Sequence, residues 1–239
     1  PTDAPPTATP TAVPFRGGKQ IVAPYMSSPP VLDGTWDEWD APQLAANLWI
    51  YNKSAWDGPE DLDLAYRVAW DNTYLYVAVK VTDDKYVQNA TGADLYKGDS
   101  LEILLDTDLL GDFYSTNLSA DDYQLGISGG KGGEGLYALN GPSEAYLWFP
   151  VGVAGSRSQV KIALSRGVTG ESKPAYRGEF AIPWSMFGIS PYNGMRLGFG
   201  VSASDNDNAS SNVQESMISN VANRSLVNPT TWRELYLSK

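Results

Sequence analysis

The 239-residue sequence contains neither cysteine nor histidine. The lack of cysteine excludes disulfides, thiolate chemistry and zinc sites built on cysteine. The lack of histidine excludes a Ser-His-Asp triad and histidine-ligated haem, and it removes the commonest general base and transition-metal ligand.

Positive charge and long apolar runs are also scarce. The chain carries 17 Lys and Arg against 28 Asp and Glu, a net charge of −11. Such a chain repels the phosphates of nucleic acids and anionic lipids, so we expect neither as a partner. No run approaches the roughly 18 apolar residues of a membrane helix, so we expect no direct membrane insertion. The acidic chain suits a cation or a neutral ligand, and it is also rich in aromatic residues, with eight Trp and fourteen Tyr.

The first fourteen residues, PTDAPPTATPTAVP, consist largely of proline, threonine and alanine. This composition cannot bury a core, and proline biases it toward an extended polyproline II conformation. We therefore predict that residues 1–19 form an extended Pro/Thr-rich spacer that joins neighbouring domains or subunits to a single domain at 20–239.

Short runs that alternate between apolar and polar residues follow the spacer. The runs DLDLAYRVAWD (61–71) and YLYVAVKVTDD (74–84) are separated by Asp-Asn-Thr, which predicts a β-hairpin. Further strands are predicted at 100–106, 123–128, 146–151, 159–165, 176–183, 195–205 and 231–237. Without a long amphipathic helix, this pattern indicates an all-β fold, an antiparallel β-sandwich of the jelly-roll or immunoglobulin-like kind.

Aspartates gather in the loop after the strand predicted at 100–106. Calcium binds about six to eight oxygens, often from closely spaced carboxylates and backbone carbonyls. Asp and Gly also favour ordinary turns, which is the simpler explanation of the same pattern. Because such a cluster repels itself without a cation, we predict structural calcium here, with SDNDN (204–208) as a second candidate. The predicted ligands are Asp106, Asp108, Asp112, Asp121 and Asp122.

Six phrases of the sequence together resemble a known family. They are VLDGTWDEWDAP (31–42), AWDNTYLYVAVKVTDD (69–84), LYKGDSLEILLDTD (95–108), DDYQLGIS (121–128), YRGEFAIPWSMFG (176–188) and LGFGVSASDND (197–207). In this order they resemble family 9 carbohydrate-binding modules, within the wider DOMON-like group of β-sandwiches. The resemblance implies a non-catalytic module of a secreted or cell-surface bacterial protein, which binds an oligo- or polysaccharide between two tryptophans and carries structural calcium.

The resemblance also implies where a sugar would bind. The first clamp aromatic precedes GDSLEI and is Tyr96 in this chain, whose ring can stack on a sugar face. Glu102 and Gln124 match polar residues that contact sugar hydroxyls. A solvated glutamate and an exposed or core-capping tyrosine are the simpler explanations of Glu102 and Tyr96.

Other positions depart from the family. Its arginine and asparagine after the glutamine are replaced by Gly126 and Ser128, and its second clamp tryptophan by Leu226. Trp148 offers another aromatic platform, although a tryptophan is more often part of a core. We expect weak affinity or a different ligand, because fewer contacts remain. The predicted ligand-binding residues are Tyr96, Glu102, Gln124, Ser128 and Trp148.

Two alternatives remain open at this point. One is a structural or sensory extracellular domain of a surface assembly or receptor that keeps the sandwich and has lost sugar binding. The other is a haem-binding relative, whose iron would need Met or Lys as a ligand. Glycosidase activity is not expected, because the acids lie at strand ends and in loops rather than as a facing pair.

Overall fold

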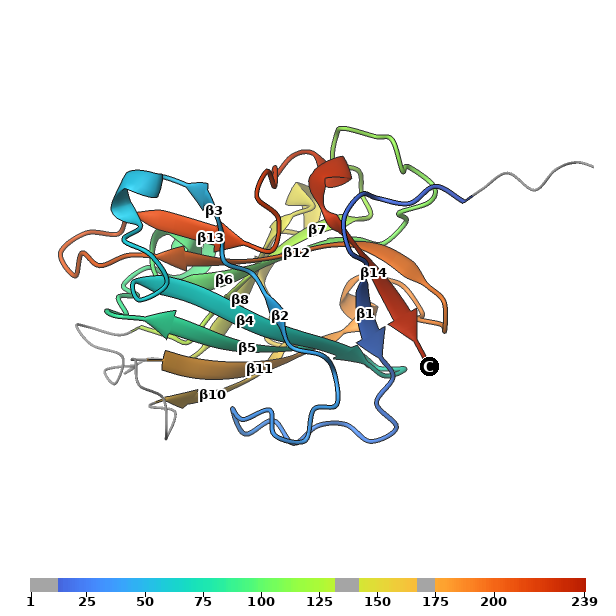
Figure 1. The fold of residues 1–239 in the computed structure, drawn as a ribbon, viewed down its shortest axis with the longest axis horizontal. Helices are drawn as coiled ribbons and strands as arrows, with labels where there is room; N and C mark the ends of the chain where they lie inside the picture. Colours follow the sequence, from blue (N-terminus) through green and yellow to red (C-terminus); the bar gives the residue numbers. More distant parts are fainter. Residues whose placement is uncertain (1–12, 132–141, 167–174) are drawn as a thin grey trace, which may run out of the picture.

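The computed structural model describes residues 13–131, 142–166 and 175–239, and within them two β-sheets dominate the fold (Figure 1). Residues 1–12, the greater part of the predicted spacer, lie outside the described residues. The strands of the small sheet lie below β12 and β13 of the large sheet in Figure 1. The predicted all-β sandwich is confirmed.

The large sheet has nine strands. Its main path is β1 (Ile21–Pro24), β14 (Arg233–Ser238), β12 (Arg196–Asp205), β6 (Ser100–Asp106), β7 (Asp122–Ser128), β8 (Glu144–Phe149) and β9 (Gly155–Ser156). A branch from β12 continues through β13 (Ser216–Ser219) to β3 (Leu48–Tyr51). The pairs are antiparallel except β1 with β14, which is parallel.

The small sheet has five strands in the order β10 (Lys161–Arg166), β11 (Ala175–Pro183), β5 (Tyr74–Asp83), β4 (Leu62–Trp70) and β2 (Leu44–Ala45). Five short 3-10 helices connect strands within the described residues: η1 (Lys53–Ala55), η2 (Gly92–Lys97), η3 (Val151–Val153), η4 (Trp184–Met186) and η5 (Pro229–Thr231). The predicted hairpin is the pair β4 and β5, with Trp70 opposite Leu75.

The core lies between the two sheets and is filled by alternate residues of their strands. On β5 the inward set is Leu75, Val77, Val79 and Val81, each at most 1% exposed. On β6 the inward set is Leu101, Ile103 and Leu105. Each such side chain stabilises the fold by roughly 1.5–3 kcal/mol when fully buried. Because the side chains of a strand alternate, Glu102 on β6 and Gln124 on β7 point away from this core.

The segment before β1 is held against the large sheet. The Arg16 guanidinium lies 3.0 Å from Asp106 Oδ2, with both side chains buried, and Arg16 Nη1 donates to the Pro229 carbonyl at 2.6 Å. Arg196 Nη2 donates to the Pro14 carbonyl at 2.6 Å. The last residues of the predicted spacer therefore contact the sandwich.

Candidate functional site

A cleft of about 420 Å³ lies on the outer face of the large sheet. Strands β3, β6, β7, β8 and β13, the helix η2 and the loop before β14 all contribute to it. Its volume falls within the range of small-molecule sites. The lining residues are Ile50, Tyr51, Tyr96, Glu102, Gln124, Trp148, Gln214, Met217, Arg224 and Leu226.

Four of the five ligand-binding residues predicted from the sequence line this cleft. They are Tyr96, Glu102, Gln124 and Trp148. The fifth, Ser128, is not among the lining residues. Ser128 is 1% exposed, and its hydroxyl accepts a hydrogen bond from the Gly130 amide at 3.0 Å. The structure therefore gives Ser128 a local role at the end of β7.

The polar centre of the cleft is a carboxylate with two donors. Gln124 Nε2 donates to Glu102 Oε2 at 2.8 Å, and Arg224 Nη1 donates to Glu102 Oε1. The side chains of Arg224 and Glu102 are only 3% and 6% exposed, so the ion pair is buried. Arg224 also donates to Met217 Sδ at 3.1 Å. Glu102 is therefore fixed in position and charge-compensated.

Sequence reasoning missed Arg224, because it lies in a loop far along the chain from Glu102. The two residues are 122 positions apart. A lone arginine in a loop does not by itself indicate which carboxylate it will contact.

The Trp148 ring lies against β7 at Gly126, which leaves room for it. A Cβ atom at Gly126 would lie 2.2 Å from Trp148 Cη2, closer than side chains approach each other. The indole Nε1 donates to the Ala93 carbonyl of η2 at 2.8 Å. The Tyr96 ring packs edge-on against it, with centroids 6.3 Å apart. Trp148 is thus part of the cleft wall and is not a core residue.

Replacing Gly126 by alanine is therefore expected to displace the Trp148 ring. Overpacking of this kind costs about 1–3 kcal/mol, and the displaced ring would no longer support Tyr96. Urea unfolding monitored by tryptophan fluorescence measures both effects. Gly152, around which a Cβ would meet nothing within 4 Å, provides the matched control. An unchanged unfolding free energy in Gly126→Ala would contradict the expectation.

Three of the five predicted calcium ligands come together at the loop after β6. Oxygens of Asp106, Asp112 and Asp121 lie within 4.8 Å of one another. The Asp108 side chain is exposed and lies over Gly111 instead, and the Asp122 carboxylate accepts from the Ser119 amide at 2.7 Å. Arg16 already provides one positive charge beside Asp106.

A second acidic group is more deeply buried and lies at the opposite end of β6 and β12. It joins Asp83, Asp99 and Asp205, all at most 1% exposed, with one oxygen of each within 4.8 Å of the others. Each aspartate accepts a hydrogen bond through one oxygen, from Lys85 N, Val87 N and Ser216 Oγ respectively. The other oxygens, Asp83 Oδ2, Asp99 Oδ1 and Asp205 Oδ1, are buried without a hydrogen-bond partner.

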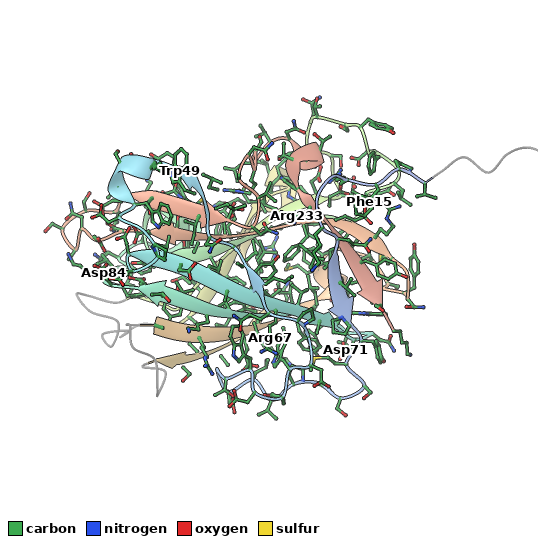
Figure 2. All side chains as sticks on the ribbon, in the orientation of Figure 1. Phe15, Trp49, Arg67, Asp71, Asp84 and Arg233 are labelled. Atoms are coloured by element: carbon green, nitrogen blue, oxygen red, sulfur yellow. The ribbon has the colours of Figure 1, made fainter. Side chains whose placement is uncertain are left out.

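A third group adjoins the second and contains Asp61, Asp84 and Asp207. Figure 2 shows Asp84 at the edge of the molecule, on the opposite side from Phe15 and the segment before β1. Asp205 and Asp207 belong to the predicted second candidate, SDNDN, whereas Asp61 and Asp99 were not foreseen. Isolated single aspartates at a strand start carry no metal signature in the sequence.

Burial and mutual repulsion disfavour negative charge in these groups. Desolvation, reinforced by Asp83 and Asp207, raises the pKa of Asp205 to about 8. Desolvation also raises the pKa of Asp83 to about 7 and that of Asp99 well above its ordinary value. At the other loop, desolvation raises the pKa of Asp106 to about 7, although Arg16 opposes the shift. A bound cation would offset this penalty in each group.

Residues 31–239 match the sequence profile of the carbohydrate family 9 binding domain-like family. The chain belongs to this family. Among solved structures, a family 9 carbohydrate-binding module from Caldicellulosiruptor kristjanssonii in complex with cellotriose matches with a TM-score of 0.64 and 22% identity, covering 92% of this chain and 94% of that one. A family 9 module from the same organism in complex with glucose also matches, with a TM-score of 0.64.

Two curated relatives are enzymes that are much longer than this chain. The module is 27% identical over 188 residues to endo-1,4-beta-xylanase A of Thermoanaerobacterium saccharolyticum and 26% identical over 190 residues to exoglucanase XynX of Acetivibrio thermocellus. Each alignment covers 78% of this chain, but only 13% and 14% of the two enzymes. The module thus corresponds to a small part of each relative.

The described part of this carbohydrate-binding module contains no helix with the length and apolar character of a membrane span.

Proposed function

We propose that the module binds a neutral oligo- or polysaccharide in the cleft and has no catalytic activity of its own. The observation that supports this proposal most is the convergence of Tyr96, Glu102, Gln124 and Trp148 in one cleft. These residues come from η2, β6, β7 and β8, so their meeting is a property of the fold rather than of one segment.

The charge of the cleft favours a neutral ligand. Among the described residues that line it, the charged ones are Glu102 and Arg224, and they pair with each other. An anionic sugar would have to break this buried pair and would also meet the net charge of −11. A neutral sugar can use Glu102 as a fixed acceptor and Gln124 as a further polar contact.

Aromatic stacking would supply the remaining affinity. Tyr96 is 39% exposed, and its ring is braced edge-on by Trp148. A sugar ring presents an apolar face of C–H groups that suits such a platform. The complexes of the structural relative with cellotriose and glucose agree with a neutral glucan unit as ligand.

The cleft offers little for glycoside hydrolysis. That reaction generally needs two carboxyl groups facing each other across the scissile bond, roughly 5–9 Å apart. Glu102 is the single carboxylate among the described lining residues and is occupied by Arg224 and Gln124. A module of this kind would tether neighbouring domains to polysaccharide outside a bacterial cell, through the Pro/Thr-rich spacer.

Calcium would brace the loops around the sandwich. The group of Asp83, Asp99 and Asp205 fits calcium because one carboxylate oxygen of each residue lies within 4.8 Å of the others, and because each residue has a buried oxygen without a hydrogen-bond partner. Asp106, Asp112 and Asp121 form the corresponding group at the loop after β6. The cation would neutralise repelling charges and hold the strand ends together, and it would take no part in sugar chemistry.

Calorimetric titration tests the proposed sugar site. In calcium-containing buffer, the wild-type chain is expected to bind cello-, xylo- or manno-oligosaccharides, and Tyr96→Ala should weaken the affinity at least about tenfold, equivalent to 1.4 kcal/mol. Oligogalacturonate should not bind. Tyr114→Ala is the matched control, because Tyr114 is 79% exposed and does not line the cleft.

If the folded wild-type chain bound none of the sugars, this result would contradict the proposal and favour a structural or sensory extracellular domain. If the Tyr96→Ala and wild-type chains bound sugar with equal affinity, the sugar site would have to lie outside this cleft. Circular dichroism of each variant confirms that it is folded.

A further inference from the structure

The cleft has a second exposed tyrosine that the sequence did not single out. Tyr51 ends β3, is 48% exposed and lines the cleft together with Tyr96. Within the described residues, its hydroxyl makes no hydrogen bond and its ring packs against no other ring. A large aromatic side chain left free at the rim of a binding cleft is a typical ligand contact.

The strand register separates Tyr51 from the polar centre of the cleft. Tyr51 is opposite Met217 on β13, Met217 is opposite Ser204 on β12, and Ser204 is opposite Ser100 on β6. Ser100 precedes Glu102 by two residues. Strands are spaced about 4.8 Å apart, so Tyr51 is about 14 Å from β6 along the sheet.

The ring of Tyr96 is directed to the other side of that centre, whereas its backbone carbonyl accepts a hydrogen bond from Ser204 Oγ on β12 at 3.2 Å. Its ring packs against Trp148 on β8, two strands beyond β6 in the direction away from β3. A sugar unit that stacks on Tyr96 and reaches Glu102 therefore occupies the side of the cleft nearer β8. The side nearer β3, where Tyr51 lies, remains for a second unit.

The position of Tyr51 is fixed by the residue after it. Asn52 is the single non-glycine residue with positive φ among the described residues, at 46°. Its side-chain Nδ2 donates to the Glu215 carbonyl at 2.8 Å, which ties the end of β3 to the start of β13. This turn holds Tyr51 beside Met217, a buried residue of the neighbouring strand that also lines the cleft.

From this geometry we infer that Tyr51 forms a second sugar subsite and that the module recognises an oligosaccharide of at least two units. This inference rests on the proposed sugar binding in the same cleft. Leu226 also lines the cleft, but it has no ring to stack on a sugar. Tyr51 therefore provides the second aromatic contact from a different strand, and to a different sugar unit than Tyr96.

Titration of Tyr51 variants with short and long ligands tests the subsite. The probes are glucose and cellotriose, and xylose and xylotriose, at fixed calcium. Tyr51→Ala is expected to weaken trisaccharide binding at least about fivefold and to leave monosaccharide binding within about twofold, because the Tyr96 side remains intact. Tyr51→Phe should retain trisaccharide affinity, since stacking needs the ring and not the hydroxyl.

Trp49→Ala is the matched control on the same strand. Trp49 lies at the upper left of the molecule in Figure 2 and is 38% exposed. The Lys53 ammonium lies over its ring, and Trp49 does not line the cleft. Unchanged trisaccharide affinity in Tyr51→Ala, or an equal loss for both ligand lengths, would overturn the subsite. If the wild-type chain bound no sugar, the proposed function itself would fail, and the subsite with it.

Discussion

Calcium is expected to raise the melting temperature of the chain by about 5–10 °C at pH 8, and by far less at pH 5. A cation present at 100 times its dissociation constant stabilises a folded protein by about 2.7 kcal/mol. In a domain of this size, each kcal/mol shifts the melting temperature by about 2–4 °C. Chelation by EDTA should remove this gain.

The pH dependence follows from the raised pKa values of Asp83, Asp99 and Asp205. Without calcium, the pKa is raised to about 7 for Asp83, to about 8 for Asp205 and well above its ordinary value for Asp99, so the folded chain retains protons that the unfolded chain releases near pH 3.8. Because the folded state binds more protons in the window between the unfolded and the folded pKa values, the free energy of unfolding falls as the pH rises. Calcium needs the deprotonated carboxylates, so its stabilisation grows over the same window.

Thermal unfolding in EDTA and in calcium, at four pH values from 5 to 8, measures this difference. Asp205→Asn should raise the melting temperature of the calcium-free chain at pH 8, because it removes a buried charge, and should reduce the response to calcium. The exposed Asp40 provides the control substitution Asp40→Asn, which should change neither. If calcium did not change the melting temperature at pH 8, the calcium proposal would be contradicted.

Replacing Arg224 by methionine is expected to destabilise the chain by about 3–5 kcal/mol, as the loss of one partner of a buried ion pair generally does. The substitution would leave the buried Glu102 carboxylate with Gln124 as its remaining donor. Sugar affinity should fall as well, because Glu102 would no longer be held in one position. Urea unfolding and calorimetric titration measure the two effects separately.

A double variant separates charge from packing. Glu102→Gln added to Arg224→Met removes the uncompensated charge and should recover most of the lost stability. Sugar binding should remain weak, since the fixed acceptor is absent. Equal stability of Arg224→Met and the wild-type chain would show that the ion pair is not buried in solution.

The sandwich could be predicted because successive residues of its long strands alternate between the core and the outer face of each sheet. The two-residue alternation of β4, β5 and β6 identified their inward residues, and the structure places those residues in the core. The strands β1, β2, β3, β9 and β13 have at most four residues, which is too short for such a pattern to emerge. They form through pairing with distant strands, which the sequence does not display.

The difference between long and short strands also helps to explain which residues of the candidate site could be predicted. Tyr96, Glu102 and Gln124 could be found because they lie in phrases that resemble the family, and Trp148 because it is an aromatic residue of a predicted strand. The other half of the cleft comes from β3, β13 and the loop before β14, so Tyr51 and Arg224 were missed. Long-range pairing also brings Asp99 to Asp205, although 106 positions separate them in the sequence.

The parallel pairing of β1 with β14 also determines how the module would respond to mechanical force. Ile21 pairs with Leu235, and Pro24 pairs with Ser238. The chain thus enters β1 at one end of this strand pair, and β14 finishes at the other end (Figure 1). Tension between these two points would shear all hydrogen bonds of the pair at once instead of opening them one by one. When a neighbouring domain pulls on a module that is bound to its substrate, we expect a high force to be needed to unfold the module.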